Sequence, residues 1–274
     1  MSSLNRMLQI LDAFTVEKPT RSTDELIKYI GSSRSTAYRY VRALQKCGLL
    51  SPVANGSWTL GSRILELDLQ LRSCDPLYLT AGPTMTRLVE KTGHTALLCT
   101  LYSDAVICIR DVRAVGAPSG LFSRGQRRPL FTAAASKIML PYLPPHQLRR
   151  VYTHNKAAIA AAHLGRDWKE FLAILREMRS NGYCFTVGEF RPGVVGIAAP
   201  IIGRSGSAVA SLGVAFPKSK LRAGQKDAFV AIVRELADGL SKKIRRTESE
   251  IDMSARAIGR VQAPVSGAKS KLSL

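Results

Sequence analysis

The chain has 274 residues, enough for two domains, and its 40 basic and 20 acidic residues give a formal net charge of +20 at pH 7. That excess favours a polyanionic partner, with nucleic acid ahead of a membrane surface. No apolar run approaches the roughly 20 residues of a membrane span, the N-terminus is not a signal peptide, and no Cys/His spacing suits zinc, so we expect a cytoplasmic protein without membrane contact, metal or cofactor.

The N-terminal residues predict two helices. Apolar side chains recur at helical spacing over residues 4–14. Ser22 then begins a second helix as the N-cap of a capping box, with Glu25 three residues on, and Gly31 ends it. Only a few residues separate this helix from the next, which is the spacing of a helix-turn-helix.

Residues 32–46 predict a third helix with two distinct faces. Ala37, Val41 and Leu44 form an apolar face, whereas the outer face carries cations and hydroxyls without a carboxylate. Such a face suits the major groove of DNA, where Arg bonds guanine edges and hydroxyls bond phosphates or bases. We therefore expect DNA contacts from Ser33, Arg34, Ser35, Thr36, Tyr38, Arg39 and Arg42. The alternative is a solvated basic helix face.

A β-hairpin is predicted directly after this helix. Asn55-Gly56 between apolar stretches is the strongest short hairpin signal, and it places strands at residues 49–54 and 57–60. A hairpin in this position is a wing, so the N-terminal segment predicts a winged helix-turn-helix, and Asn55 joins the expected DNA contacts. A winged helix that contacts only protein is the alternative.

Two motifs in this segment are specific in combination. Ser35-Thr36-Ala37-Tyr38-Arg39 lies on the third helix, and Trp58-Thr59-Leu60-Gly61 ends the wing. They resemble the DNA-binding half of IclR-type bacterial transcription regulators. The resemblance implies a DNA-binding domain over residues 1–61 and double-stranded DNA as its partner. Because one recognition helix reads only a few base pairs, a two-fold operator and a protein dimer are expected.

A linker helix follows the wing. Ile64, Leu65, Leu67 and Leu71 continue a helical pattern that Asp75-Pro76 breaks, which gives a linker over residues 62–75. In the resembled family this helix contributes to dimerisation. A helix that packs only on its own domain is the alternative.

Residues 76–246 predict an α+β domain, because helices and strands interleave irregularly. Helical patterns cover 77–92, 131–140, 144–152, 166–180 and 222–246, and strand patterns cover 94–101, 105–112, 183–187, 193–202 and 207–216. Residues 125–137, 181–201 and 208–214 resemble the effector-binding domain of the same family. The resemblance implies a mainly antiparallel sheet flanked by helices, a GAF/PAS-like fold that holds a small organic ligand.

The resemblance also implies the residues of an effector pocket. In the family a small acid is held by N–H groups at a helix N-terminus, which fall here on Ala134 and Ala135, next to Ser136. The other expected effector residues are Thr186, Glu189, Gly196, Gly213 and Ala215. Small side chains leave volume, so we expect an aromatic acid rather than glyoxylate or pyruvate. The alternatives are that these residues only pack the sheet and that Glu189 pairs structurally.

Residues 247–274 lose hydrophobic periodicity and predict a basic, disordered tail that either solubilises the chain or attracts DNA nonspecifically. Catalytic motifs such as G-x-S-x-G and H-E-x-x-H do not occur, so no enzyme is expected. The sequence therefore predicts a transcription regulator, a repressor or an activator, that acts as a homodimer or homotetramer and responds to a small organic acid. A winged-helix scaffold or ligand-binding protein and a small-molecule enzyme remain the alternatives.

Overall fold

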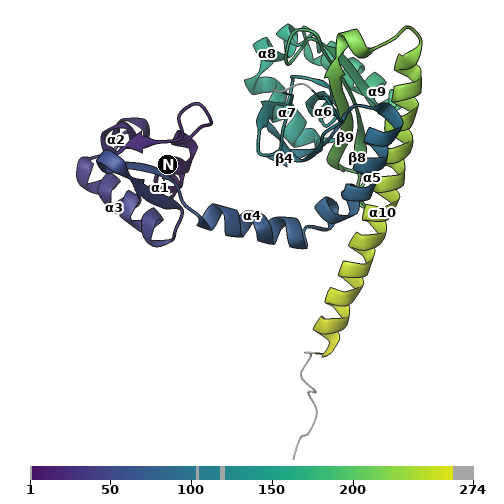
Figure 1. The fold of residues 1–274 in the computed structure, drawn as a ribbon. Coiled ribbons are helices and arrows are strands. Elements are labelled where there is room, and N and C mark those ends of the chain that lie inside the picture. The colour runs from purple at the N-terminus through teal and green to yellow at the C-terminus, as the bar shows by residue number, and fades with distance from the viewer. Residues whose placement is uncertain (1, 103–104, 118–120, 262–274) are drawn as a thin grey trace, which may run out of the picture. The chain divides into compact units, whose positions relative to one another are not determined.

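The chain divides into two units between Asp75 and Pro76 (Figure 1). The structure is a computed structural model that describes residues 2–102, 105–117 and 121–261. A helical N-terminal unit with a small sheet is followed by a unit built on an antiparallel sheet with helices. This arrangement confirms the predicted α+β fold class.

The first unit is a winged helix-turn-helix. Its helices are α1 (Ser3–Gln9), α2 (Thr23–Ile30) and α3 (Arg34–Lys46), and its strands β1 (Arg21–Ser22), β2 (Leu50–Val53) and β3 (Ser57–Leu60) pair antiparallel in the order β1-β3-β2. The first predicted helix tightens after Gln9 into a 3₁₀ helix, Ile10–Ala13. Ile10, Leu26, Val41 and Leu44 share one buried core, so the apolar face of α3 packs on the neighbouring helices.

The predicted capping box begins α2. The side chain of Ser22 accepts a hydrogen bond from the Glu25 N–H at 3.2 Å, and the Glu25 carboxylate accepts one from the Ser22 N–H at 2.9 Å. Gly31 ends the helix in the left-handed region at φ 59°. The Lys18 ammonium also contacts the Glu25 carboxylate. These local contacts fix where the first helix of the helix-turn-helix starts and ends.

The capping carboxyl makes the first unit sensitive to acid. The hydrogen bond from Lys18 and then that from the Ser22 N–H lower the pKa of Glu25 from an ordinary 4.5 to about 2. Because the folded pKa lies below the unfolded one, the stabilisation is complete above pH 4.5 and is lost as the pH falls from 4.5 toward 2. We expect Glu25→Gln, which cannot titrate, to flatten this part of the acid transition. Trp58 fluorescence in a Trp168→Phe background follows the acid unfolding of the first unit, and Glu90→Gln is the control. An acid transition in Glu25→Gln equal to that of the wild type would contradict the role of Glu25.

Helix α4 (Arg63–Cys74) forms the linker, and it has no buried residue. Leu65, Leu67, Leu69 and Leu71 are exposed by 71%, 41%, 58% and 59%. Because each helical residue turns by about 100°, leucines two residues apart fall on opposite sides of the helix. The linker therefore exposes apolar side chains on two faces, where the sequence had suggested one.

The second unit contains a six-stranded antiparallel sheet in the order β6-β5-β4-β9-β8-β7. The strands are β4 (Thr95–Tyr102), β5 (Ala105–Val112), β6 (Arg127–Pro129), β7 (Cys184–Val187), β8 (Val194–Ile202) and β9 (Ala208–Pro217). The helices are α5 (Pro76–Thr92), α6 (Ala134–Lys137), α7 (Pro145–His154), α8 (Lys156–Ala161), α9 (Trp168–Asn181) and α10 (Gln225–Val261).

Both faces of this sheet are buried. Ala96 and Leu98 of β4 belong to a core shared with α5 and α10, whereas Leu97 and Cys99 belong to a second core shared with α6 to α9. This alternation follows from the two-residue period of a strand. Figure 1 shows α5 and α10 lying along one side of the sheet. The candidate pocket lies on the α6 side.

Four elements differ from the sequence prediction. Strands β1 and β6 were not predicted, and α6 is a single turn that begins at Ala134 rather than at Phe131. Helix α10 continues to Val261, so the chain is helical where the tail was expected to begin at residue 247. The rest of the predicted tail, residues 262–274, lies outside the described residues.

Candidate DNA interface and effector pocket

The polar residues predicted to contact DNA lie together on α3. At about 100° per residue, Arg34, Ser35, Tyr38, Arg39 and Arg42 occupy an arc of about 140°, and all five are exposed. The opposite side of the helix is buried in the core of the first unit. The structure thus presents cations and hydroxyls from consecutive turns on one open face.

The hydroxyls at the start of α3 form a small cluster. Ser33 is the N-cap, and its side chain accepts a hydrogen bond from the Thr36 N–H at 3.4 Å. The Oγ of Ser33 also lies 2.9 Å from Thr36 Oγ1 and 3.2 Å from Ser35 Oγ. Ser33 is therefore partly committed to capping, and Thr36 is only half exposed.

The cations of this face differ in whether a carboxylate pairs with them. Arg34 Nη2 lies 3.0 Å from Asp24 Oδ1, and both side chains are more than two-thirds exposed. Such a surface pair is worth about 0–1 kcal/mol, so a phosphate can replace the carboxylate at little cost. Among the described residues, no carboxylate lies within ion-pair distance of Arg39 or Arg42. Those two guanidinium groups are available to a polyanion.

Tyr40 is a structural residue of α3 that the sequence reading missed. It is 6% exposed, and its hydroxyl lies 2.7 Å from Ser3 Oγ on α1. Its position three residues after the buried Ala37 is the signal that would have found it. The contact holds the recognition helix against α1.

The wing presents Asn55 at the tip of its hairpin. Asn55 is exposed and has φ 59° and ψ 31°, and Gly56 follows at φ 66°. Both left-handed conformations suit an Asn-Gly hairpin. Trp58 Nε1 donates to Thr23 Oγ1 at 3.0 Å, which fixes the wing against the start of α2.

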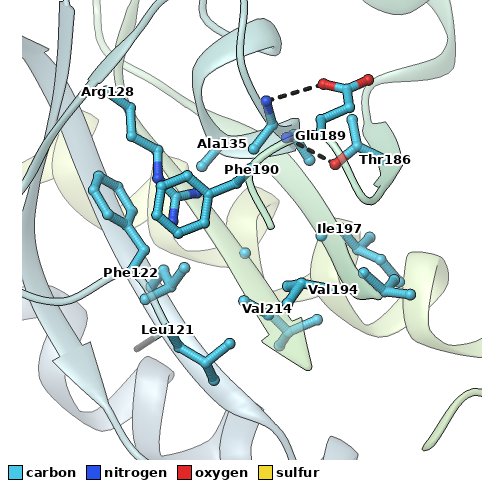
Figure 2. Close-up of a pocket in the computed structure, with 17 residues that line it drawn as sticks. Leu121, Phe122, Arg128, Ala135, Thr186, Glu189, Phe190, Val194, Ile197 and Val214 are labelled. Atoms are coloured by element: carbon cyan, nitrogen blue, oxygen red, sulfur yellow. Dashed lines mark hydrogen bonds between the residues drawn. The ribbon is translucent and has the colours of Figure 1, made fainter. Parts of the chain in front are cut away.

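Seven of the eight predicted effector residues line one pocket in the second unit (Figure 2). They are Ala134, Ala135, Thr186, Glu189, Gly196, Gly213 and Ala215. Ser136 does not line it. That residue is fully buried, and its hydroxyl has no hydrogen-bond partner among the described residues. The single turn of α6 directs Ser136 into the protein, so its expected contact with an effector stays a prediction.

The expected anion donors of α6 are largely occupied. The Ala133 N–H donates to Glu189 Oε2 at 3.0 Å, and the Ala134 N–H donates to Thr186 Oγ1 at 3.1 Å (Figure 2). No described residue accepts a hydrogen bond from the N–H of Ala135. In this structure the Ala134 amide is thus not free, since the Thr186 side chain already uses it, and its contact with an effector stays a prediction.

A charged network holds this turn in place. Lys137 Nζ lies 2.6 Å from Glu189 Oε1 and donates to the Ala162 carbonyl at 2.9 Å. Ala133 has φ 65°, a conformation that costs about 1–3 kcal/mol in a residue other than glycine. The Ala133 N–H donates to Glu189 in this turn, and Lys137 pairs with the same carboxylate. Glu189 therefore has the structural pairing role that the sequence left open as an alternative.

The glycines of the pocket serve close packing. A Cβ at Gly196 would lie 3.1 Å from Thr186 Oγ1, and a Cβ at Gly213 would lie 2.4 Å from the backbone oxygen of Ile197. These residues therefore bring α6 and the strands close together instead of leaving volume. The free volume in the pocket is about 20 Å³, which holds about one water molecule.

Arg128 is a pocket residue that the sequence reading missed. It lies on β6 with its side chain directed inward, and it is only 6% exposed, whereas its neighbours Arg127 and Pro129 are exposed. Its Cζ lies 3.7 Å from the ring centroid of Phe122 and 3.2 Å from that of Phe190 (Figure 2). Period-two alternation across Arg127-Arg128 would have pointed to it if β6 had been predicted.

Within residues 2–102, 105–117 and 121–261, no group of three or more His, Cys, Asp or Glu side chains could hold a metal ion. No helix in the same ranges is long and apolar enough to cross a membrane.

Family models match both units of the chain. The model described as Bacterial transcriptional regulator IclR C-terminal matches residues 73–242, and the model described as IclR helix-turn-helix domain matches residues 3–54. The chain is also similar to the HTH-type transcriptional regulator BhcR of Paracoccus denitrificans (strain Pd 1222). The two are 26% identical over 246 residues, which cover 88% of each protein.

Solved structures share the fold. An IclR transcriptional regulator from Alicyclobacillus acidocaldarius has a TM-score of 0.76 at 23% identity, over 88% of this chain and 98% of that one. An IclR homolog from Microbacterium hydrocarbonoxydans, complexed with 4-hydroxybenzoate, has a TM-score of 0.70 at 23% identity, over 89% of this chain and 100% of that one.

Proposed function

Because the chain belongs to the IclR family of bacterial transcriptional regulators, we propose that it binds a two-fold operator as a homodimer and that a small aromatic acid modulates this binding. Membership of the family confirms the predicted DNA-binding regulator with an effector domain, and it confirms that the chain is not an enzyme. The proposal adds the symmetry of the operator, the contact residues and the class of ligand.

The open cationic face of α3 is the observation that carries the DNA part. We assign residues 1–61 to DNA binding, residues 62–75 to the linker and residues 76–246 to the effector domain. Arg39 and Arg42 contact bases, because they lie on that face and have no carboxylate partner among the described residues. Ser33, Arg34, Ser35, Thr36, Tyr38 and Asn55 contact phosphates or neighbouring bases.

The exposed leucines of α4 support a dimer. Four exposed leucines on two sides of α4 are an apolar surface that a second copy of the same helix can cover. A dimer places two recognition helices on one duplex and doubles the base contacts. Pairing of dimers into tetramers would use the second apolar side.

The pocket next to α6 supports the effector part. Its lining joins the predicted residues, Ala134, Ala135, Thr186, Glu189, Gly196, Gly213 and Ala215, to the aromatic side chains Phe122 and Phe190. Aromatic faces in an apolar pocket favour a planar ring. The similar protein from Microbacterium hydrocarbonoxydans is complexed with an aromatic acid, 4-hydroxybenzoate.

Selection of bound sequences from random DNA duplexes tests the proposal. We expect the full chain to select two inverted half-sites whose centres are about 10 base pairs, or a multiple of that, apart. The double variant Leu65→Glu/Leu69→Glu should sediment as a monomer and bind the selected site more weakly, whereas Gln70→Glu on the same helix should behave as the wild type. An unsymmetrical site, or no selected sequence, would favour the protein-contacting alternative.

A further inference from the structure

We propose that Arg128 recognises the carboxylate of the effector. Phe122 and Phe190 form a slot that the Arg128 guanidinium fills, and an aromatic ring enters this slot by displacing the guanidinium. This inference rests on the proposed function, because it concerns the ligand of the same pocket. It moves the main anion contact from the amides of α6 to a side chain on β6.

Arg128 carries a buried positive charge. The side chain is only 6% exposed, and its Nε is buried without a hydrogen-bond partner among the described residues. Burial lowers its pKa to about 10, so the guanidinium remains charged near neutral pH. A buried charge without a counter-ion is destabilising, and a ligand that brings the opposite charge offsets that cost.

The groups around Arg128 do not supply the opposite charge. Glu189 lines the same pocket, but its two oxygens are used by Lys137 and by the Ala133 N–H. Cys99 is also nearby, and its hydrogen bond to Cys108 together with burial raises the pKa of its thiol, so it stays neutral. Since Lys137 balances Glu189, the described groups of the pocket carry one uncompensated positive charge.

Phe122 and Phe190 form a slot whose shape suits a flat group. The ring centroids of Phe122 and Phe190 are 6.2 Å apart, and the guanidinium lies between the two rings. A guanidinium and an aromatic ring are both flat and about equally thick, so each can stack on a phenylalanine face. The two rings are inclined by 51°, so they form a wedge that opens to one side.

There is little space for a ligand beside Arg128. The free volume there is about 20 Å³, room for about one water molecule, so a ring enters where the guanidinium lies. Once displaced, the guanidinium keeps its charge and can bind a carboxylate with two parallel hydrogen bonds. Ala135, whose N–H no described residue accepts, is the backbone donor left to assist it. One cation and one aromatic slot together specify a monoanionic aromatic acid.

Calorimetric titration of the full chain with 4-hydroxybenzoate, related aromatic monocarboxylates and the uncharged 4-hydroxybenzamide tests this assignment. We expect Arg128→Met to weaken carboxylate binding by at least about 30-fold. Binding of the uncharged amide should be at least as strong as in the wild type, because the ring no longer displaces the guanidinium. Arg128→Lys should give an intermediate loss, because an ammonium keeps the charge but not the planar pair of donors. Arg127→Met, on the outward side of the same strand, should bind carboxylates as the wild type does.

Thermal melting and operator binding separate this role from a structural one. Because Arg128→Met removes an unpaired buried charge, its melting temperature should equal or exceed that of the wild type, and it should bind operator normally without ligand. A lower melting temperature, unchanged carboxylate affinity in Arg128→Met, or failure of the wild type to bind any of the carboxylates would overturn the assignment. Failure of the wild type to bind a two-fold DNA site would instead overturn the proposed function, whatever Arg128 does.

Discussion

Replacing Arg39 with alanine is expected to weaken operator binding by roughly 30-fold to more than 10,000-fold. Arg39 is exposed near the centre of the α3 face and has no ion-pair partner among the described residues. A bidentate contact to a guanine edge contributes about 1–3 kcal/mol. A two-fold complex loses that contact twice, and every 1.4 kcal/mol is tenfold in affinity. Fluorescence anisotropy with the selected operator at fixed salt measures the change.

The control for Arg39→Ala removes the same charge elsewhere in the first unit. Arg63 is partly exposed at the start of α4 and pairs with Glu66, so Arg63→Ala should weaken binding to operator and random DNA alike. Arg39→Ala should instead lower the preference for operator over random DNA. If Arg39→Ala, like Arg63→Ala, weakened binding to operator and to random DNA equally, Arg39 would contact only phosphate. Since Arg39 contributes nothing to the buried core, both proteins should melt as the wild type does.

The DNA-binding half was predictable because its signals are local. The capping box at Ser22 and Glu25 lies within one turn, and the Asn55-Gly56 hairpin lies within a few residues. The two faces of α3 follow from the helical period, which the order of apolar and polar residues in the sequence displays directly. Tyr40 was missed because an aromatic residue with a hydroxyl can lie on either face until its partner on α1 is known.

The effector pocket was predictable only in outline. Its members come from strands and turns far apart in the chain, and their roles depend on contacts that no local pattern contains. The amide of Ala134 is occupied by Thr186, 52 residues away, and Ser136 turns inward because α6 is a single turn. Arg128 was missed because β6 has three residues, too few to display an alternating pattern.

The small side chains of the pocket show a further limit of sequence reasoning. A glycine in a strand suggests either space for a ligand or close approach of another backbone, and the sequence does not distinguish the two. At Gly196 and Gly213 the structure shows close approach, since an added Cβ would contact Thr186 or the backbone of β8. Volume was therefore the wrong argument for an aromatic ligand, and the aromatic pair around Arg128 is the better one.

Gly61→Ala is expected to destabilise the first unit by at least about 3 kcal/mol and to abolish operator binding under the same conditions. Gly61 ends the wing, and a Cβ there would lie 2.1 Å from the carbonyl oxygen of Gly48 and 2.8 Å from its carbon. Both are backbone atoms, and the Gly61 N–H donates to the Leu49 carbonyl at 2.9 Å, so neither segment can move without losing contacts. That loss is a large part of a typical stability of about 5–15 kcal/mol.

Gly31→Ala is the matched control, because it separates a steric overlap from the cost of a left-handed backbone. Gly31 has φ +59°, but an added Cβ would have no heavy atom within 4 Å. A left-handed conformation costs alanine about 1–2 kcal/mol, so this variant should melt slightly lower and still bind operator. Trp58 fluorescence in the Trp168→Phe background follows the first unit. If Gly61→Ala and Gly31→Ala lost the same stability, the wing would accommodate a side chain at Gly61. The wing would then be packed less tightly than the contact between Gly61 and Gly48 implies.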